Sequence, residues 1–340
     1  MESILVCPAC RTRTPDDRVP GGFRLDLRTL ERAGELLVCA CGRRCPVIDG
    51  VPMVMADPSP YLRDDVTTVI ERDLDPEVAA LLVEGGPDDA PYPRLLEVLS
   101  VYMDAHWGDR ATPPPDGAVD ASALVAKLEQ RREAPVARAV ELGCNVGRGL
   151  AALAAGAELV VGIDTKHALL RRARRLLAGE PVPYARRIVG RHYAPATAVA
   201  GDRAVPGDRV VLVCGDALDP PLVPGWFDRV VALNLVDNVS QPRQLLAVMD
   251  ALCAPGGELI LASPYVWVSG TTAEDARLGG ADPATELVRI LTTGDGLGAA
   301  YTVEDEAELP WTLRRERRAS ISYRVHYVRV RKPGRAGSSG

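Results

Sequence analysis

The segment from Glu141 to Gly149 constrains this chain most, because an apolar run ends there in an acid and passes at once into a glycine-rich turn. Residues 136–142 are typical of a strand, and residues 150–155 are typical of a helix. The glycines therefore fall in a strand-to-helix turn, where a backbone without a Cβ can approach a ligand closely. The segment predicts a nucleotide-type cofactor site and leaves several ligands open.

From about residue 136 the chain alternates short apolar strands with helices, which is the pattern of a parallel sheet covered on both faces. The predicted strands are residues 137–142, 158–163, 209–214, 229–233 and 258–262. Residues 320–331 alternate strictly with no helix after them, so we expect an antiparallel strand that closes the sheet. The predicted fold class is α/β, a doubly wound, Rossmann-like, seven-stranded and mainly parallel sheet over residues 136–332, followed by a disordered tail at 333–340.

The charge and the apolar runs exclude some classes of protein. The net charge is −6 and charges of both signs are interspersed, which gives no strong nucleic-acid signal. Every apolar run is far shorter than the roughly 20 residues of a membrane helix. Cys7 and Cys10 stand where a secretory signal would have its apolar core. We expect a cytoplasmic protein that does not bind membranes.

The cysteines are clustered, with five of the eight before residue 46. In a reducing compartment such clustering favours a metal over disulfides. A unit of residues 1–56 is too small to be stable on its apolar core alone and needs a disulfide or a bound metal. We therefore predict a zinc ribbon with a structural Zn²⁺ ion bound by four thiolates. The predicted ligands are Cys7, Cys10, Cys41 and either Cys39 or, as the alternative, Cys45. Residues 57–135 are predicted to form a helical connector or lid, with helices near 75–84, 92–106 and 121–132.

The glycine spacing departs from the G-x-G-x-x-G turn of nicotinamide sites, because Asn145 stands at the second glycine position. An acid two residues before a G-x-[GN]-x-G turn resembles motif I of class I S-adenosylmethionine-dependent methyltransferases. Further motifs follow in that family's order, with acids at Asp164 and Asp216, Asn234 after the fourth predicted strand, and the Pro-Gly-Gly turn at 255–257.

The resemblance implies S-adenosylmethionine as the cofactor, with Glu141 at its ammonium group, Asp164 at its ribose hydroxyls, and Asp216 with its neighbour at its adenine. The cofactor-binding residues so predicted are Glu141, Gly143, Cys144, Asn145, Gly147, Asp164, Thr165, Asp216, Ala217 and Asn234.

A loop with two aromatic residues, Ser263-Pro264-Tyr265-Val266-Trp267, follows the fifth predicted strand. Together with residues 234–237 and the Leu-Gly-Gly at 278–280, it resembles the mercaptohistidine N-methyltransferase domain of ovothiol synthases, although their sulfur-inserting module has no counterpart here. The resemblance implies N-methylation of a histidine or thiohistidine derivative, an amine or the terminus of a modified peptide, in natural product biosynthesis. The candidate catalytic residues are Asp237, Tyr265 and His106, and the candidate substrate contacts are Trp267 and Asn238.

Residues 37–52 resemble the small zinc-ribbon protein that activates tRNA and ribosomal methyltransferases. This resemblance implies a protein partner docked through the ribbon, and tRNA or ribosomal-protein methylation is the second hypothesis. Asn234 is followed by Leu235-Val236-Asp237 rather than by the N-P-P-Y type signature of such enzymes. A third hypothesis is a non-catalytic cofactor-binding scaffold.

Overall fold

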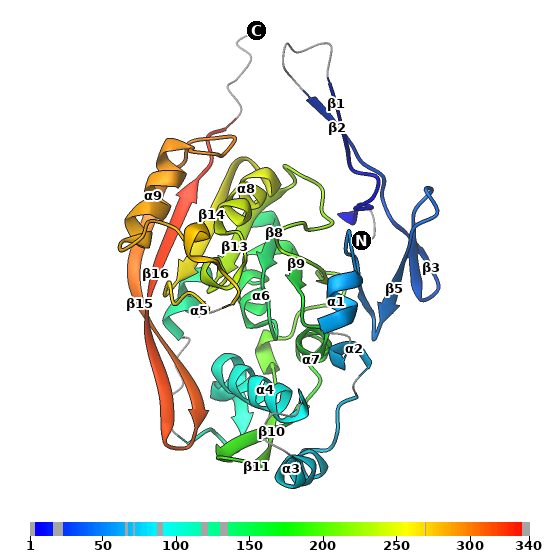
Figure 1. Cartoon of the computed structure of the whole chain (residues 1–340), viewed down its shortest axis with the longest axis vertical. Coiled ribbons are helices and arrows are strands. Elements are labelled where there is room, and N and C mark those ends of the chain that lie inside the picture. Colours follow the sequence, from blue (N-terminus) through cyan, green and yellow to red (C-terminus); the bar gives the residue numbers. More distant parts are fainter. Residues whose placement is uncertain are drawn as a thin grey trace.

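The computed structural model describes residues 4–15, 23–64, 67–70, 72–86, 91–116, 122–129, 135–268 and 270–334 (Figure 1). Most of the tail predicted at 333–340 lies outside these residues. Within the described ranges, no helix combines the length and the apolarity needed to span a membrane.

A seven-stranded sheet forms the centre of the molecule (Figure 1). Its strands are β8 (Val136–Leu142), β9 (Ala157–Asp164), β12 (Val210–Cys214), β13 (Phe227–Leu233), β14 (Cys253–Ser263), β15 (Thr302–Glu316) and β16 (Ala319–Arg331). They lie in the order β12-β9-β8-β13-β14-β16-β15, and β16 runs antiparallel to both of its neighbours. The predicted fold class is confirmed. Because β8 pairs with β9 on one side and β13 on the other, the strand order reverses at β8, where such folds bind ligands.

Alternating side chains of the central strands build two apolar cores, one on each face of the sheet. Ala139 and Val160 belong to one core, and Val140 and Val161 to the other. The first core includes side chains of α6 (Arg148–Leu153) and α7 (His167–Leu177). The second includes side chains of α8 (Pro242–Leu252) and α9 (Pro283–Thr293). This two-sided burial explains why the strands are nearly continuous apolar runs.

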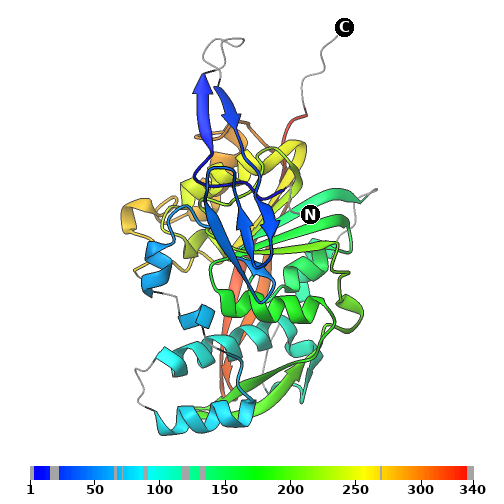
Figure 2. The same cartoon turned by 90° about the vertical axis from the view of Figure 1, so that its right-hand side faces the viewer.

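The N-terminal unit consists of short strands, the last of which contacts the β12 edge of the sheet (Figure 2). The strands are β1 (Thr12–Pro15), β2 (Phe23–Asp26), β3 (Glu31–Ala33), β4 (Leu36–Val38), β5 (Arg44–Ile48) and β6 (Val51–Pro52). Met53 forms a parallel bridge to Cys214, and Leu5 forms an antiparallel bridge to Leu222. The unit therefore protects an edge strand and shares the sheet's core.

The segment between this unit and the sheet is mainly helical. Its elements are α1 (Ser59–Asp64), α2 (Thr67–Ile70), α3 (Pro76–Gly85), α4 (Pro91–Trp107), the 3-10 turn η2 (Gly108–Arg110), β7 (Ala111–Thr112) and α5 (Ser122–Glu129). Asp75 caps α3 by accepting a hydrogen bond from the backbone N–H of Glu77, and Pro76 suits the first helical position. The helices predicted near 75–84 and 92–106 are confirmed. The one predicted at 121–132 is α5, and residues 121 and 130–132 lie outside the described part.

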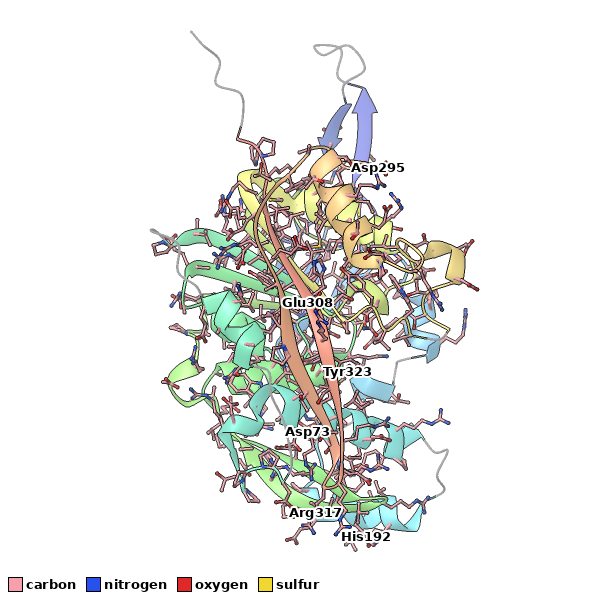
Figure 3. The ribbon with its side chains drawn as sticks, turned by 90° about the vertical axis from the view of Figure 1, so that its left-hand side faces the viewer. Asp73, His192, Asp295, Glu308, Arg317 and Tyr323 are labelled. Carbon is pink, nitrogen blue, oxygen red and sulfur yellow. The ribbon has the colours of Figure 1, made fainter. Side chains whose placement is uncertain are left out.

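A hairpin of β10 (Val182–Val189) and β11 (His192–Ala198) was not predicted, and it pairs with β7. The long β15–β16 hairpin, which carries Tyr323, extends to this region (Figure 3). At its tip the backbone N–H of Arg317 donates a hydrogen bond to the carbonyl oxygen of Ile188 in β10. Buried Asp104 of α4 accepts hydrogen bonds from Arg186 at 2.8 Å and Arg314 at 3.2 Å. This buried ion cluster fixes α4 relative to β10 and β15, because removing one partner would leave a charge buried without compensation.

Candidate functional site

A cavity of about 480 Å³ lies at the carboxyl ends of β8, β9 and β13. Side chains from α4, α5, β15 and β16 form its opposite wall. The lining residues are Val98, Tyr102, His106, Leu124, Val125, Leu128, Glu141, Gly143, Asn145, Arg148, Gly149, Asp164, Lys166, Leu169, Leu233, Asn234, Leu235, Asp237, Asn238, Pro264, Val266, Val268, Trp311, Leu313 and Tyr323. Many of the predicted site residues therefore line this cavity.

The glycine turn follows β8 and requires left-handed backbone at three positions. Gly143, Asn145 and Gly147 have φ values of +77°, +50° and +81°. Glycine adopts this region without strain, and asparagine tolerates it better than most residues. Helix α6 begins directly after the turn, and Gly147 is its N-cap.

The carboxylate of Glu141 is only 3% exposed and faces the cavity beside this turn. A Cβ on Gly149 would lie 2.2 Å from its Oε1 atom, so only glycine leaves room for this side chain. Its Oε2 atom has no hydrogen-bond partner among the described residues. Burial, reinforced by the negative charge of Asp164, raises the pKa of Glu141 to about 8. A buried acid of this kind favours a cationic ligand.

Asp164 lies at the end of β9. Its Oδ2 accepts a hydrogen bond from the backbone N–H of Asn145 at 2.9 Å, and its Oδ1 accepts one from that of Lys166 at 2.9 Å. Burial raises the pKa of this carboxyl, and the two backbone N–H groups oppose that shift. Each oxygen keeps a lone pair, so the carboxylate is held in place and can still accept two hydroxyl groups.

Arg148 is a site residue that the sequence analysis missed. The residue is 8% exposed, its guanidinium lies 5.0 Å from the centre of the Trp107 ring, and its Nη2 donates a hydrogen bond to Asp109 at 2.9 Å. Its Nη1 atom has no partner in the described part of the chain. Its place directly before the last glycine of the turn is the sequence signal that could have found it. Glu141 and Arg148 thus present a carboxyl group and a guanidinium group, each with one unpartnered atom, to the same cavity.

His106 and Tyr102 reach the cavity from α4, with their rings 6.1 Å apart. Burial, together with the positive charge of Arg148, lowers the pKa of His106 to about 4. The imidazole is therefore neutral near pH 7 and one of its nitrogens can accept a proton or a hydrogen bond. Burial raises the pKa of Tyr102, with smaller effects of Asp164 and Tyr323.

The segment after β13 brings three predicted residues to the cavity. Asn234 has a φ of +51°, and its carbonyl oxygen accepts a hydrogen bond from the Asn238 side chain at 2.9 Å. Asp237 is 1% exposed and accepts from the backbone N–H of Val266 at 2.8 Å. Burial raises the pKa of Asp237. Asp237 thereby ties this segment to the loop after β14.

The two aromatic residues of that loop are not among the residues that line the cavity. The hydroxyl group of Tyr265 lies 2.8 Å from Nδ1 of His326, whose Nε2 lies 3.0 Å from Glu306. The ring of Trp267 lies 6.3 Å from that of Tyr265. Burial raises the pKa of Tyr265. The Tyr265–His326–Glu306 chain was not foreseen, because its members come from distant segments; the catalytic and substrate roles assigned to Tyr265 and Trp267 stay predictions.

The remaining cofactor candidates lie around the cavity rather than in its lining. Cys144 is buried against Gly162, where a Cβ would lie 2.7 Å from its sulfur atom. Thr165 follows Asp164, and its carbonyl oxygen lies 3.5 Å from the Cys214 thiol. Asp216 is exposed and accepts from the backbone N–H of Leu218 at 2.8 Å, while Ala217 is buried.

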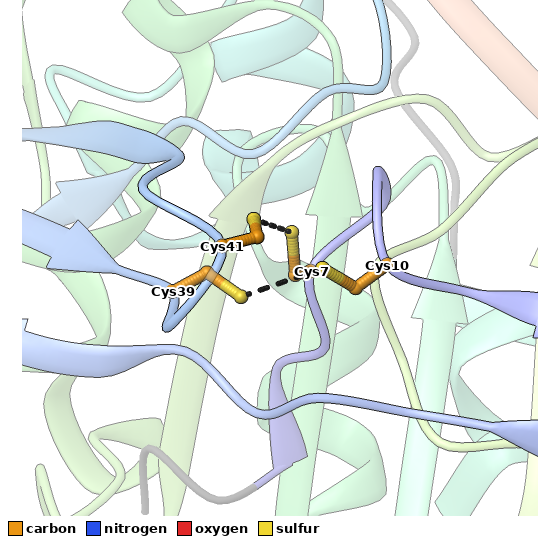
Figure 4. Close-up of side chains that lie close together, drawn as sticks. All are labelled: Cys7, Cys10, Cys39 and Cys41. Atoms are coloured by element: carbon orange, nitrogen blue, oxygen red, sulfur yellow. Dashed lines mark hydrogen bonds between the residues drawn. The ribbon is translucent and has the colours of Figure 1, made fainter.

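Four cysteines form a second candidate site in the N-terminal unit (Figure 4). The sulfur atoms of Cys7, Cys10, Cys39 and Cys41 all lie within 4.8 Å of one another. Those of Cys7 and Cys41 are 3.8 Å apart, and those of Cys10 and Cys39 are 3.7 Å apart. Cys45 is buried outside this group. Of the two alternatives for the fourth ligand, the geometry favours Cys39.

Part of the chain is similar to a known protein family. Residues 140–261 match the family described as "Methyltransferase domain", and this stretch runs from β8 into β14. The matched stretch thus coincides with the parallel part of the sheet described above.

A curated relative is the demethylmenaquinone methyltransferase of Clavibacter sepedonicus, which is 31% identical over 172 residues, covering 50% of this chain and 52% of that protein. The chain therefore spans about half the length of that relative. Among solved structures, N-methyltransferase NodS of Bradyrhizobium japonicum WM9 is 18% identical with a TM-score of 0.39, covering 62% of this chain and 93% of that chain. A complex of the Haloferax volcanii Trm112 methyltransferase activator with a methyltransferase gives 14% identity and a TM-score of 0.42, covering 72% of this chain and 96% of that chain.

Proposed function

We propose that this protein is an S-adenosylmethionine-dependent methyltransferase. The observation that carries the proposal is the pair of buried groups facing one cavity, the carboxyl Oε2 of Glu141 and the guanidinium Nη1 of Arg148, neither of which has a hydrogen-bond partner in the described structure. An amino-acid head group, with its ammonium and carboxylate, complements this pair. The residues at the strand ends therefore fit the proposed cofactor.

In this proposal the residues at each strand end bind one part of the cofactor. Glu141 binds the methionyl ammonium group and Arg148 the methionyl carboxylate. Asp164 accepts the ribose hydroxyls, while Asp216 and Ala217 contact the adenine. The left-handed turn of Gly143, Asn145 and Gly147 lets the backbone run beside the cofactor, with Cys144, Thr165 and Asn234 around it. When bound, the cofactor supplies an electrophilic methyl group on a sulfonium sulfur.

The acceptor is proposed to be a nitrogen of a small molecule or peptide terminus, as the resemblance to the ovothiol synthase domain implies. The nitrogen lone pair forms the new bond to the methyl carbon, the carbon–sulfur bond breaks and its electron pair goes to sulfur. Such a displacement depends mainly on alignment and needs only a weak proton acceptor. Asp237, whose pKa is raised by burial, can take the released proton. Neutral His106 and Asn238 can hold the acceptor through hydrogen bonds, and Tyr265 and Trp267 would contact it from outside the cavity lining.

We also propose that the four clustered cysteines bind one structural Zn²⁺ ion. A tetrahedral site with zinc–sulfur bonds of about 2.3 Å separates its sulfur atoms by about 3.8 Å, close to the two separations described above. Four thiolates fill the coordination shell, so the metal would hold the fold rather than act on substrate. Metal analysis of the purified protein should find about one zinc per chain, and a folded, metal-free protein would overturn this assignment.

Calorimetry with S-adenosylhomocysteine tests the main proposal. The wild type should bind it, and Asp164→Ala should bind at least about tenfold more weakly because the ribose hydroxyls lose their acceptors. Asp275→Ala, which removes an exposed carboxylate elsewhere, is the matched control and should bind as the wild type does. No binding by the wild type, or equal binding by the Asp164 variant, would contradict the proposal.

A further inference from the structure

The wall of the cavity that faces the strand ends is built from apolar and aromatic side chains. They are Tyr102 of α4, Leu124 and Leu128 of α5, Trp311 and Leu313 of β15, and Tyr323 of β16. Trp311 and Tyr323 are cross-strand partners whose ring centres lie 5.7 Å apart at an interplanar angle of 32°. Rings held in this way offer flat surfaces on which another ring can stack.

The charged side chains that line the cavity all belong to the opposite side. They are Glu141, Arg148, Asp164, Lys166 and Asp237, and each follows or ends a central strand. Among the described residues of α4, α5, β15 and β16, the lining includes no charged side chain, because the low pKa of His106 keeps its imidazole neutral. A carboxylate placed against this wall would lose its water without gaining a cation.

We propose, resting on the proposed function, that the methyl acceptor presents a flat, uncharged aromatic ring to this wall, and that the site rejects acceptors with a carboxylate on the enclosed part. An uncharged ring gains apolar burial and stacking on Trp311 and Tyr323, and its reacting heteroatom can face the neutral His106. A free amino acid meets the opposite situation, since its carboxylate has no partner on the wall. Among histidine-like acceptors, the inference selects those whose carboxylate is absent, blocked or outside the cavity.

Binding to the complex with S-adenosylhomocysteine tests this inference with three probes that differ in charge and in aromaticity. Indole is flat and uncharged, indole-3-acetate carries the same ring with a carboxylate, and cyclohexylamine is a cation of similar size without an aromatic ring. Calorimetry should show indole binding at least about tenfold more tightly than either of the others. Equal or tighter binding of indole-3-acetate or cyclohexylamine would overturn the inference, and so would failure of indole to bind. If S-adenosylhomocysteine itself fails to bind, the proposed function is what fails.

A charge placed in the wall should reverse the preference. Leu313→Lys puts a cation among the rings and should favour indole-3-acetate over indole, a change of at least about tenfold in the ratio of the two dissociation constants. Leu81→Lys is the matched control, because Leu81 of α3 is 67% exposed and does not line the cavity. An unchanged ratio in folded Leu313→Lys, judged by its S-adenosylhomocysteine binding, would contradict the inference. Should that variant not fold, the comparison of probes on the wild type still decides.

Discussion

The two sides of the cavity differ both in charge and in the way the chain builds them. The strand-end side carries Glu141, Arg148 and Asp164, which lie close together in sequence on β8, α6 and β9. The opposite wall brings together Tyr102, Leu124 and Trp311 from three separate parts of the chain, and it is apolar. In the proposed function, cofactor recognition thus rests on short, local motifs, whereas acceptor recognition rests on long-range packing. Substitutions can therefore damage one side and spare the other.

The largest effect is expected from Gly149→Ala on the strand-end side. The added Cβ would lie 2.2 Å from the Glu141 carboxylate, so either that side chain or the turn must move. Calorimetry should show S-adenosylhomocysteine binding weakened on the order of a hundredfold, because small displacements of binding groups are costly. Gly156→Ala is the control, since its nearest neighbour would be 4.0 Å away. Similar affinities for the two variants would contradict the assigned geometry.

Arg148→Met should have a smaller effect that depends on the ligand. Loss of charge-assisted hydrogen bonds to the methionyl carboxylate should weaken S-adenosylhomocysteine binding about tenfold to a hundredfold. Binding of 5′-methylthioadenosine, which lacks the amino-acid head, should not change in the same titrations. Arg324→Met, at a side chain 81% exposed, serves as the control. Equal weakening of both ligands would show that Arg148 acts through the fold rather than through the carboxylate.

Glu141→Gln should remove a pH dependence. The pKa of Glu141 is raised from 4.5 to about 8 in the folded protein. The stability gained from its protonated form is therefore fully present below pH 4.5 and lost as the pH rises through 8. Without ligand, the Tm of the wild type should fall between pH 6 and 9 more than that of Glu141→Gln.

The titration of the Glu141 carboxyl should also make S-adenosylhomocysteine binding depend on pH. Because the ionised carboxylate pairs with the ammonium group, binding releases a proton, and the affinity of the wild type for S-adenosylhomocysteine should rise by up to about tenfold per pH unit between pH 6 and 8. The affinity of Glu141→Gln should change little over this range. Parallel pH profiles for the two proteins would remove Glu141 from the ammonium site.

The sequence could predict the strand-end side because each of its parts is local. The strand, the acid and the glycine turn at 141–149 stand within one βα unit, and Asp164 ends the next strand. The four clustered cysteines were also predictable, since two short knuckles suffice to bring thiolates together. The choice between Cys39 and Cys45 needed the structure, which places the sulfur of Cys39 3.7 Å from that of Cys10.

The rest depended on contacts between distant segments. The β10–β11 hairpin was not predicted. The buried Asp104–Arg186–Arg314 cluster holds it against α4 and β15, and the hydrophobic pattern of the sequence does not indicate such an ion cluster. The aromatic wall arises because the β15–β16 hairpin reaches α4 and α5. Trp311 and Tyr323 could therefore not be recognised as site residues from the local sequence. For the same reason Tyr265 has His326 as its hydrogen-bond partner, outside the cavity lining.

The most direct test of this account measures two affinities on two variants, one from each side of the cavity. The ligands are S-adenosylhomocysteine, alone, and indole, added at saturating S-adenosylhomocysteine. Asp164→Ala should weaken S-adenosylhomocysteine binding at least about tenfold and, once saturated, bind indole within about twofold of the wild type. Leu313→Lys should show the reverse, with S-adenosylhomocysteine binding within about twofold of the wild type and indole binding weakened at least about tenfold. The cavity does not divide into a cofactor side and an acceptor side if each variant binds both ligands more weakly. The same conclusion follows if Asp164→Ala keeps its affinity for S-adenosylhomocysteine and Leu313→Lys keeps its affinity for indole.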